Sequence, residues 1–160
     1  MELYDWNNLW FTVFCCFELS DIQSRGRFRS LVDMMFAVEF NKDVRYFGNI
    51  LDSTSRDLHC RCIQVNNSRY GDSRIMEPKS TEVKDVIVIN GDVNASVLVS
   101  EPGVMGFRRR QLSTGGRDGL KPLPPGFDED MVRARVTGEM WDLVCTPCDT
   151  GEDDDEAWTP

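Results

Sequence analysis

The amino-acid sequence predicts an α+β fold built mostly from antiparallel β hairpins, with one or two helices and a disordered acidic C-terminal tail. Short runs of β-branched and aromatic residues between turn residues favour strands and hairpins. One segment has apolar residues at helical spacing, and the last twelve residues hold six acidic side chains and no basic one. We therefore expect one globular domain over residues 1–148 and a disordered tail over residues 149–160.

The first predicted element is an apolar run over residues 9–19, which we expect to form a buried strand or a short helix. Eleven residues are too few to span a membrane, and Glu2 and Asp5 stand where a signal peptide would be basic. We therefore expect an intracellular protein without a transmembrane segment, either cytoplasmic or also nuclear. Attachment of the run to a membrane surface is the alternative. In a reducing compartment Cys15 and Cys16 are expected as core thiols, with acylation as the alternative.

Residues 30–40 are predicted to form the best helix of the chain. Ser30 is a good N-cap residue, and Asp33 follows it at nearly capping-box spacing. The apolar residues of this segment recur at helical spacing, at Leu31, Met34, Met35 and Val38.

Strands are expected over residues 44–50 and 58–65, on either side of a polar turn. The clearest hairpin signal lies at residues 83–100, where two β-branched runs flank Asn90 and Gly91. A Gly- and Pro-rich loop follows at residues 113–126. The remaining expected strands are residues 104–112, as a strand or loop edge, and residues 131–136 with 140–145, as a last hairpin.

Four of the six cysteines form two closely spaced pairs, Cys60 with Cys62 and Cys145 with Cys148. Alternate residues of a strand point to one face, and the C-x2-C spacing lets two thiolates reach one ion. Four thiolates, or three with His59 as the alternative ligand, would complete a tetrahedral structural zinc site. The competing interpretation is that Cys60 and Cys62 are small buried core residues.

The stretch Cys145-Thr-Pro-Cys148 also resembles the C-x-P-C active site of thioredoxin-like enzymes, which implies a thiol–disulfide oxidoreductase. The twelve residues that follow cannot supply the helix and strands of that scaffold. Their negative charge would also raise the pKa of a neighbouring thiol. The sequence contains no nucleotide-binding loop or hydrolase motif, and His59 is its only histidine. We therefore expect a non-enzymatic protein, with the oxidoreductase as an alternative.

Two arginine-rich segments favour an RNA-binding module as the other alternative. Arginine beside an aromatic ring can contact phosphate while the ring stacks on a base. The competing interpretation is a solvated arginine edge that protects a strand from aggregation. The candidate residues are Arg25, Arg27, Arg29, Phe107, Arg108, Arg109 and Arg110.

The net charge of −9 comes mainly from the tail, because residues 149–156 contribute six negative charges and leave about −3 for residues 1–148. Trp158 stands at the end of this acidic run. An indole presented with charge for electrostatic steering suits a protein-binding segment. Trp158 is therefore the candidate partner-binding residue, and a solubilising chain end is the competing interpretation.

The pairs Cys60/Cys62 and Cys145/Cys148, together with the small size and composition, resemble the small accessory proteins of plant RNA viruses. Among these, the sobemovirus silencing suppressors bind zinc through scattered cysteines. The resemblance implies interference with host RNA silencing through host protein partners. Our hypothesis is therefore a non-enzymatic regulatory or host-interaction protein with a structural zinc site.

Overall fold

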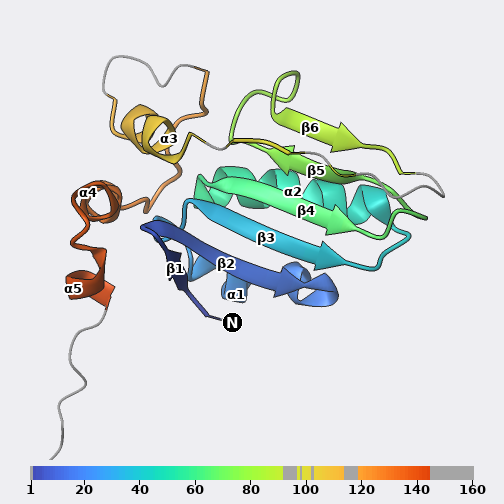
Figure 1. The fold of residues 1–160 in the computed structure, drawn as a ribbon, viewed down its shortest axis with the longest axis horizontal. Coiled ribbons are helices and arrows are strands. Elements are labelled where there is room, and N and C mark those ends of the chain that lie inside the picture. Colours follow the sequence, from blue (N-terminus) through green and yellow to red (C-terminus); the bar gives the residue numbers. More distant parts are fainter. Residues whose placement is uncertain (1, 92–96, 98, 102, 114–118, 145–160) are drawn as a thin grey trace, which may run out of the picture.

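A six-stranded mixed β-sheet forms the centre of the protein (Figure 1). The computed structural model describes residues 2–91, 97, 99–101, 103–113 and 119–144. The strands lie side by side in their sequence order, from β1 to β6. Their bounds are β1 Tyr4–Trp6, β2 Leu9–Cys15, β3 Met34–Glu39, β4 Arg61–Asn66, β5 Ser73–Met76 and β6 Asp85–Ile89.

The predicted α+β class is confirmed, and three of the five strand pairings are antiparallel. Strands β2, β3 and β4 are parallel, which the sequence analysis did not foresee. The described residues contain five α-helices and one 3-10 helix, where one or two helices were expected. Their bounds are η1 Cys16–Ser20, α1 Ile22–Gly26, α2 Val44–Leu58, α3 Val104–Gln111, α4 Glu129–Thr137 and α5 Met140–Val144.

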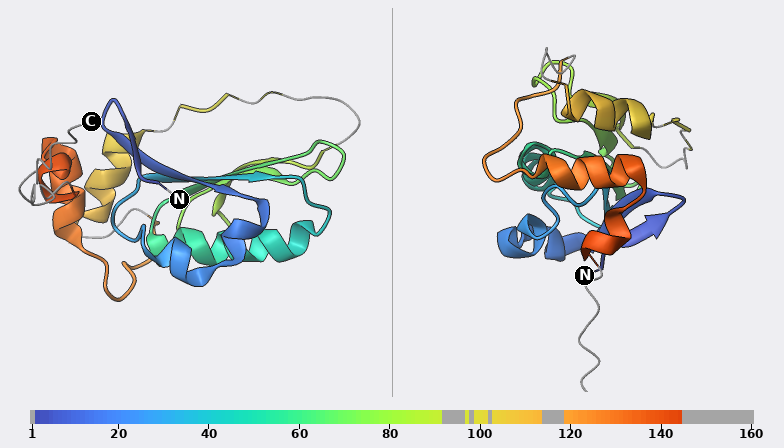
Figure 2. Two further views of the ribbon diagram at one scale, coloured as in Figure 1. Left: turned by 90° about the horizontal axis from the view of Figure 1, so that it is seen from below. Right: turned by 90° about the vertical axis from the view of Figure 1, so that its left-hand side faces the viewer.

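Helices α1 and α2 cover the same face of the sheet (Figure 2, left). Each belongs to a connection between neighbouring parallel strands, and such crossovers are right-handed. Two crossovers that step in the same direction across the sheet place their helices on one side. The main hydrophobic cluster includes residues from these helices and the sheet, and its buried members are Phe14, Leu19, Phe28, Val32, Met35, Ala37, Phe47, Leu51, Leu58, Cys60, Cys62 and Met76.

Helix α2 shows that the strand predicted over residues 44–50 is wrong. Asp43 caps the helix, because its side chain accepts a hydrogen bond from the backbone N–H of Tyr46. His59 ends the helix in the left-handed conformation, with φ 52°. The buried residues of this segment recur at helical spacing, although its aromatic and β-branched residues favoured a strand. The buried residues of α2 are Phe47, Leu51, Thr54, Ser55 and Leu58.

Strand β3 shows that the helix predicted over residues 30–40 is wrong. Ser30 does not cap a helix; its hydroxyl accepts a hydrogen bond from the backbone N–H of Asp128, at 2.7 Å. A parallel strand that is buried on both faces shows a nearly continuous apolar run. Strand β3 is of this kind only at its beginning, where the adjacent Met34 and Met35 are both buried, whereas Val38 near its other end is 50% exposed. Such a short run cannot be distinguished from a buried helix by its spacing alone.

Helices α3, α4 and α5 lie beside the amino ends of the parallel strands (Figure 1, left side). They replace the strands expected over residues 104–112, 131–136 and 140–145, so these three predictions are wrong. Asp128 caps α4 by accepting a hydrogen bond from the backbone of Asp130. Gly138 ends the helix with φ 86°, a conformation that favours glycine. A second small cluster forms there from Trp10, Ala134 and Met140.

The hairpin predicted at residues 83–100 is described only in its first strand, which is β6. This strand pairs with β5 and continues the sheet. Residues 92–96 and 98, which make up most of the expected second strand, lie outside the described residues. Gly91 has φ 83°, as expected for a glycine in a tight turn.

The predicted loop at residues 113–126 contains no helix or strand in its described part, apart from an isolated bridge between Leu120 and Lys79. Residues 145–160 lie outside the described residues. The predictions for Cys145, Cys148, Trp158 and the acidic tail therefore stay predictions.

Candidate functional site

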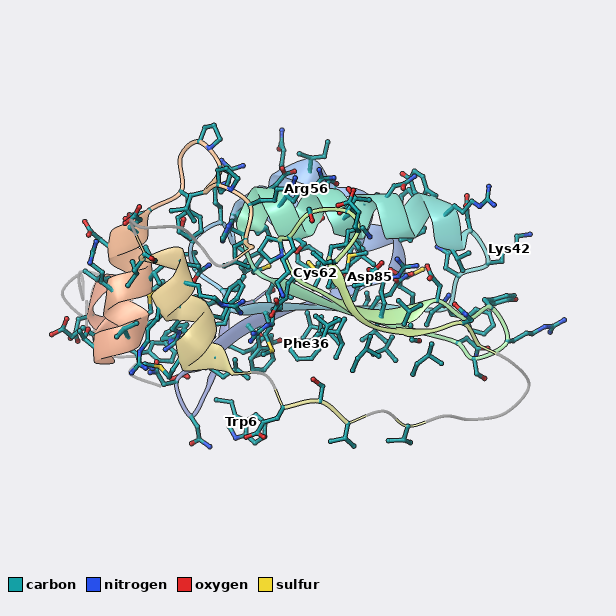
Figure 3. All side chains as sticks on the ribbon, turned by 90° about the horizontal axis from the view of Figure 1, so that it is seen from above. Trp6, Phe36, Lys42, Arg56, Cys62 and Asp85 are labelled. Atoms are coloured by element: carbon teal, nitrogen blue, oxygen red, sulfur yellow. The ribbon has the colours of Figure 1, made fainter. Side chains whose placement is uncertain are left out.

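On the side of the sheet opposite α2, the described residues place no helix over strands β1 to β4 (Figure 3). Trp6 is 69% exposed at one end of this face, and Val38 and Val65, which are register partners at the other end, are 50% and 52% exposed. Apolar side chains this accessible, gathered on one surface, are typical of a contact surface. We define the open face by the outward side chains of these strands: Tyr4, Trp6, Phe11, Val13, Phe36, Val38, Ile63 and Val65.

The limit of the open face lies at β4. Beyond it, residues 97 and 99–101 pass in front of the remaining strands (Figure 1). Val97 borders a groove of about 320 Å³ with Ile87 and Ile89 of β6. Glu101 borders a smaller hollow of about 110 Å³ that also contacts Ile63. The described part of residues 97–101 therefore partly screens the apolar side chains of β5 and β6 and lies beside Ile63 and Val65 of β4, whereas it lines no hollow with the open-face residues of β1, β2 and β3.

Three aromatic rings form a ladder across the open face. The rings of Tyr4 and Phe11 stack with centroids 5.2 Å apart, and Phe11 meets Phe36 edge to face at 5.5 Å. Each pair joins neighbouring strands, so the sheet holds the rings in place. A rigid apolar surface loses little side-chain entropy when a partner binds.

Arg61 is the only charged side chain that the described residues of β1 to β4 direct to the same side as the open face. It is 7% exposed, and its Nε donates to Oε1 of Glu77 at 2.7 Å. Burial opposes ionisation of Glu77, but hydrogen bonds from Lys79 and Arg61 outweigh it and hold the pKa of the carboxyl below its ordinary value. The described residues of β1 to β4 therefore offer no unpaired charge on this face, and the exposed carboxylate of Glu101 stands at its edge, beside Ile63.

The predicted zinc ligands Cys60 and Cys62 lie in the main hydrophobic cluster, and both are almost completely buried. Burial, followed by a hydrogen bond with Cys60, raises the pKa of the Cys62 thiol well above its ordinary value. Two buried thiols cannot complete a tetrahedral site, and Cys145 and Cys148 lie outside the described residues. The shared zinc site therefore stays a prediction.

His59, the alternative zinc ligand, uses both ring nitrogens in hydrogen bonds. Its Nε2 lies 2.9 Å from the carbonyl oxygen of Lys121, and its Nδ1 lies 3.3 Å from Nε2 of Gln111. In the described part of the chain, no three His, Cys, Asp or Glu side chains lie together in a group that could hold a metal ion. A role of His59 as a ligand would require these contacts to be exchanged.

The first arginine-rich segment that was predicted to bind RNA contains Arg25, Arg27 and Arg29, and these three side chains differ in their contacts. Arg25 is 8% exposed and donates to the hydroxyl of Thr54 at 3.0 Å. Arg29 donates to the backbone carbonyls of Asp57 and Pro125 and so ties α1 to distant segments. Arg27 is exposed.

The second arginine-rich segment, residues 107–110, is largely part of the interior. Phe107 and Arg108 are fully buried. Arg110 lies 3.6 Å from a carboxylate oxygen of Glu77, and Arg109 is exposed. The exposed members of the two candidates, Arg27 and Arg109, are those that remain accessible to RNA.

Asp33, Arg108 and Arg135 form a buried charge cluster at the amino end of β3. Arg108 binds Asp33 in a bidentate manner, with Nε 2.8 Å from Oδ1 and Nη2 2.6 Å from Oδ2. Nε of Arg135 lies 3.3 Å from Oδ1 of the same carboxylate. Desolvation lowers the pKa of Arg135 to about 10, although Asp33 opposes this shift. One carboxylate therefore holds helices α3 and α4, each through an arginine, against the sheet.

A buried acid–amide pair is formed by Glu39 of β3 and Gln64 of β4, on the side of the sheet that α2 covers. The Gln64 amide donates to Oε2 of Glu39 at 2.9 Å. Oε1 of each side chain has no hydrogen-bond partner among the described residues. Burial raises the pKa of Glu39, and the hydrogen bond from Gln64 opposes this only in part. A protonated Glu39 could donate to the Gln64 oxygen and satisfy both groups.

The roles of Asp33, Arg135 and Glu39 are not apparent in the sequence. Asp33 stands at nearly capping-box spacing from Ser30, and Arg135 lies in a segment that was predicted to be a strand. A charged residue inside an otherwise apolar segment, as at Glu39, is the signal that points to a buried pair.

No family model, curated protein or solved structure matches the chain. Within the described residues, none of the helices combines the length and the apolar character that crossing a membrane requires.

Replacement of Asp33 by asparagine tests the charge cluster. Asp33→Asn leaves two buried arginines without their counter-charge, so we expect the free energy of unfolding to fall by about 3–5 kcal/mol. Urea unfolding followed by circular dichroism measures this loss. The matched control is Asp130→Asn, on an exposed side chain whose ion pair is worth about 0–1 kcal/mol. Equal stability of the two variants would contradict the assigned role of Asp33.

Replacement of Glu39 by glutamine tests the acid–amide pair. Because the folded-state pKa of Glu39 is raised, its contribution is greatest below the unfolded-state pKa and is lost as the pH rises through the folded-state value. We therefore expect Glu39→Gln to gain stability relative to the natural protein as the pH rises, by up to about 1–2 kcal/mol. Unfolding measured between about pH 4 and 8 provides the comparison. The same trend in the exposed control Glu2→Gln would refute this account.

Metal analysis tests the zinc prediction. Full-length protein purified under reducing conditions is expected to carry about one equivalent of zinc. Cys145→Ser and Cys148→Ser should lose it, whereas Cys15→Ser, on an exposed cysteine, should retain it. Variants of the buried Cys60 and Cys62 are unsuitable because they would disturb the core directly. A zinc content below about half an equivalent in the natural protein would dispose of the site.

Proposed function

We propose that the protein is a non-enzymatic interaction protein of the regulatory or host-interaction class, which binds another polypeptide through the open face. The observation that carries this proposal is the accessible apolar surface around Trp6, Val38 and Val65. Side chains of this kind are costly to leave in water and are stabilised when a partner removes them from it. A polypeptide partner supplies the apolar surface that such a face needs.

The size of the open face supports this role. Strands β1 to β4 hold between three and seven residues each. At about 4.8 Å between strands and about 3.3 Å per residue they span roughly 350–400 Å². The largest apolar patch on a monomeric protein is usually about 300–600 Å² and is often functional. The aromatic ladder of Tyr4, Phe11 and Phe36 lies within this area and provides the anchors that are common in protein interfaces.

RNA binding receives less support from the same surface. The aromatic ladder could stack on bases, but affinity for RNA depends largely on cations that contact the phosphates. Arg61 is engaged by Glu77, and Arg108 by Asp33. The proposal for a polypeptide partner requires no such cation.

The resemblance to sobemovirus silencing suppressors makes the suppression of host RNA silencing the role to test first. In a leaf reporter-silencing assay, we expect the natural protein to restore reporter expression. The double variant Val38→Glu/Val65→Glu places two charges on the open face and should reduce the restored signal by about tenfold, as expected when contact residues worth more than 1 kcal/mol are lost.

The matched control for this assay is Val88→Glu. Val88 is 43% exposed and points to the other side of the sheet, since it pairs with Arg74 rather than with the outward residues. This variant should retain activity at equal protein abundance. No suppression by the natural protein would refute the silencing role, and full activity of the double variant would refute the open face as the binding surface.

A further inference from the structure

We propose that the polypeptide bound by the open face is a second copy of this chain, which forms a two-fold symmetric dimer with the two open faces in contact. This inference rests on the proposed function, because it takes the open face to be an interface. It adds the identity of the partner and the geometry of the complex.

The lack of unpaired charge on the described residues of β1 to β4 favours a partner with an apolar surface. Among the described residues of β1 to β4, the only charge on this side of the sheet is Arg61, which is paired with Glu77. A nucleic acid, a lipid headgroup or a strongly charged peptide would lose hydration there without gaining an ion pair. A second open face brings apolar side chains and no buried unpaired charge. The two surfaces therefore match each other in charge.

The geometry of the open face also suits self-association. In a symmetric dimer the same patch serves both subunits, so it must be complementary to itself. Val38 and Val65 are direct neighbours in the register of β3 and β4, and both project into solvent. Two such sheets can pack face to face about 10 Å apart, with their strands within about 30° of each other. Helix α2 lies on the opposite side of the sheet and would form the outer layer of each subunit (Figure 3).

The area of the face sets the expected strength of the dimer. A footprint of roughly 350–400 Å² per copy corresponds to about 700–800 Å² for two, and side chains that stand out from the sheet increase the accessible area further. Stable interfaces bury about 1,200–2,000 Å² in total, and weaker complexes lie below this range. The dimer is therefore expected to dissociate in the micromolar range.

The described part of residues 97–101 lies along the β4 edge of the open face. Val97 lines a groove with Ile63 and Val65, and Ser100 lines a hollow with Ile63, but the open-face residues of β1, β2 and β3 line neither of these hollows. Val97 is itself 88% exposed. The weak charge of about −3 on residues 1–148 opposes the approach of two copies only slightly at physiological salt.

Sedimentation equilibrium of the full-length protein tests the dimer, at concentrations from about 1 to 200 μM, which bracket the expected dissociation constant. We expect the natural protein to pass from one chain of 18.3 kDa to twice that mass over this range. Val38→Glu/Val65→Glu should stay monomeric, with its dissociation constant raised at least about tenfold. Val88→Glu, on the other side of the sheet, should dimerise like the natural protein.

Circular dichroism and thermal unfolding must show that each variant is folded. A second variant, Trp6→Ala, removes an apolar side chain that is 69% exposed without adding a charge, and it should also weaken the dimer. A natural protein that remains monomeric at about 200 μM overturns the inference, as does a double variant that dimerises normally.

The reporter assay separates this inference from the proposed function. A monomeric natural protein whose open-face variant loses silencing suppression would retain the proposed function and exclude the second copy as the partner. A dimer that the variant abolishes without loss of suppression would retain the dimer and exclude the open face as the functional surface.

Discussion

The carboxylate of Asp33 is the contact on which the arrangement of the protein depends. Besides binding Arg108 and Arg135, it accepts a hydrogen bond from the backbone N–H of Trp10 at 3.0 Å. Its backbone N–H donates to the carbonyl of Trp10, and its carbonyl accepts from Arg61. One residue thus joins the beginnings of β2, β3 and β4 to two helices that come much later in the chain. Because these groups are buried, each of these interactions is stronger than it would be in water, and the loss of any one of them would destabilise the fold.

The open face follows from the connectivity of the sheet. Both crossovers between the parallel strands step in the same direction, so α1 and α2 lie on one side. The C-terminal helices, held by the Asp33 cluster, cover the amino ends of the strands and not their other face. Consequently the described residues place no helix over the outward residues of β1 to β4, and only residues 97–101 lie beside this face, at Ile63 and Val65 of β4. An apolar surface that the chain itself leaves open is a natural place for a partner.

The sequence predicted the class of the fold. It left residues 9–19 open between a strand and a short helix, and the structure forms β2 over Leu9–Cys15 and a 3-10 helix over Cys16–Ser20. The expectation of core thiols is wrong for Cys15, which is exposed at the end of β2. The sequence also located strand β4 around Cys62, where the alternation is clear. At residues 30–40 a helix was predicted where strand β3 forms, and at residues 44–50 a strand was predicted where helix α2 forms. In both segments a short apolar run fits either period, and the choice depends on neighbours that are distant in sequence. The open face was not foreseen, because the strand pairings that bring its residues to one side join segments that are distant in sequence.

The sequence by itself determined which residues are apolar, where turn residues stand, and that six of the negative charges fall in residues 149–156. These properties are local and depend on composition and on nearest neighbours. Only the tertiary structure decided which side of each strand is covered and which charges meet. Arg108 and Arg135 resemble solvent-exposed arginines in the sequence, yet both are buried against a carboxylate from another part of the chain. Burial and ion pairing are set by contacts between distant segments, and no local pattern encodes them.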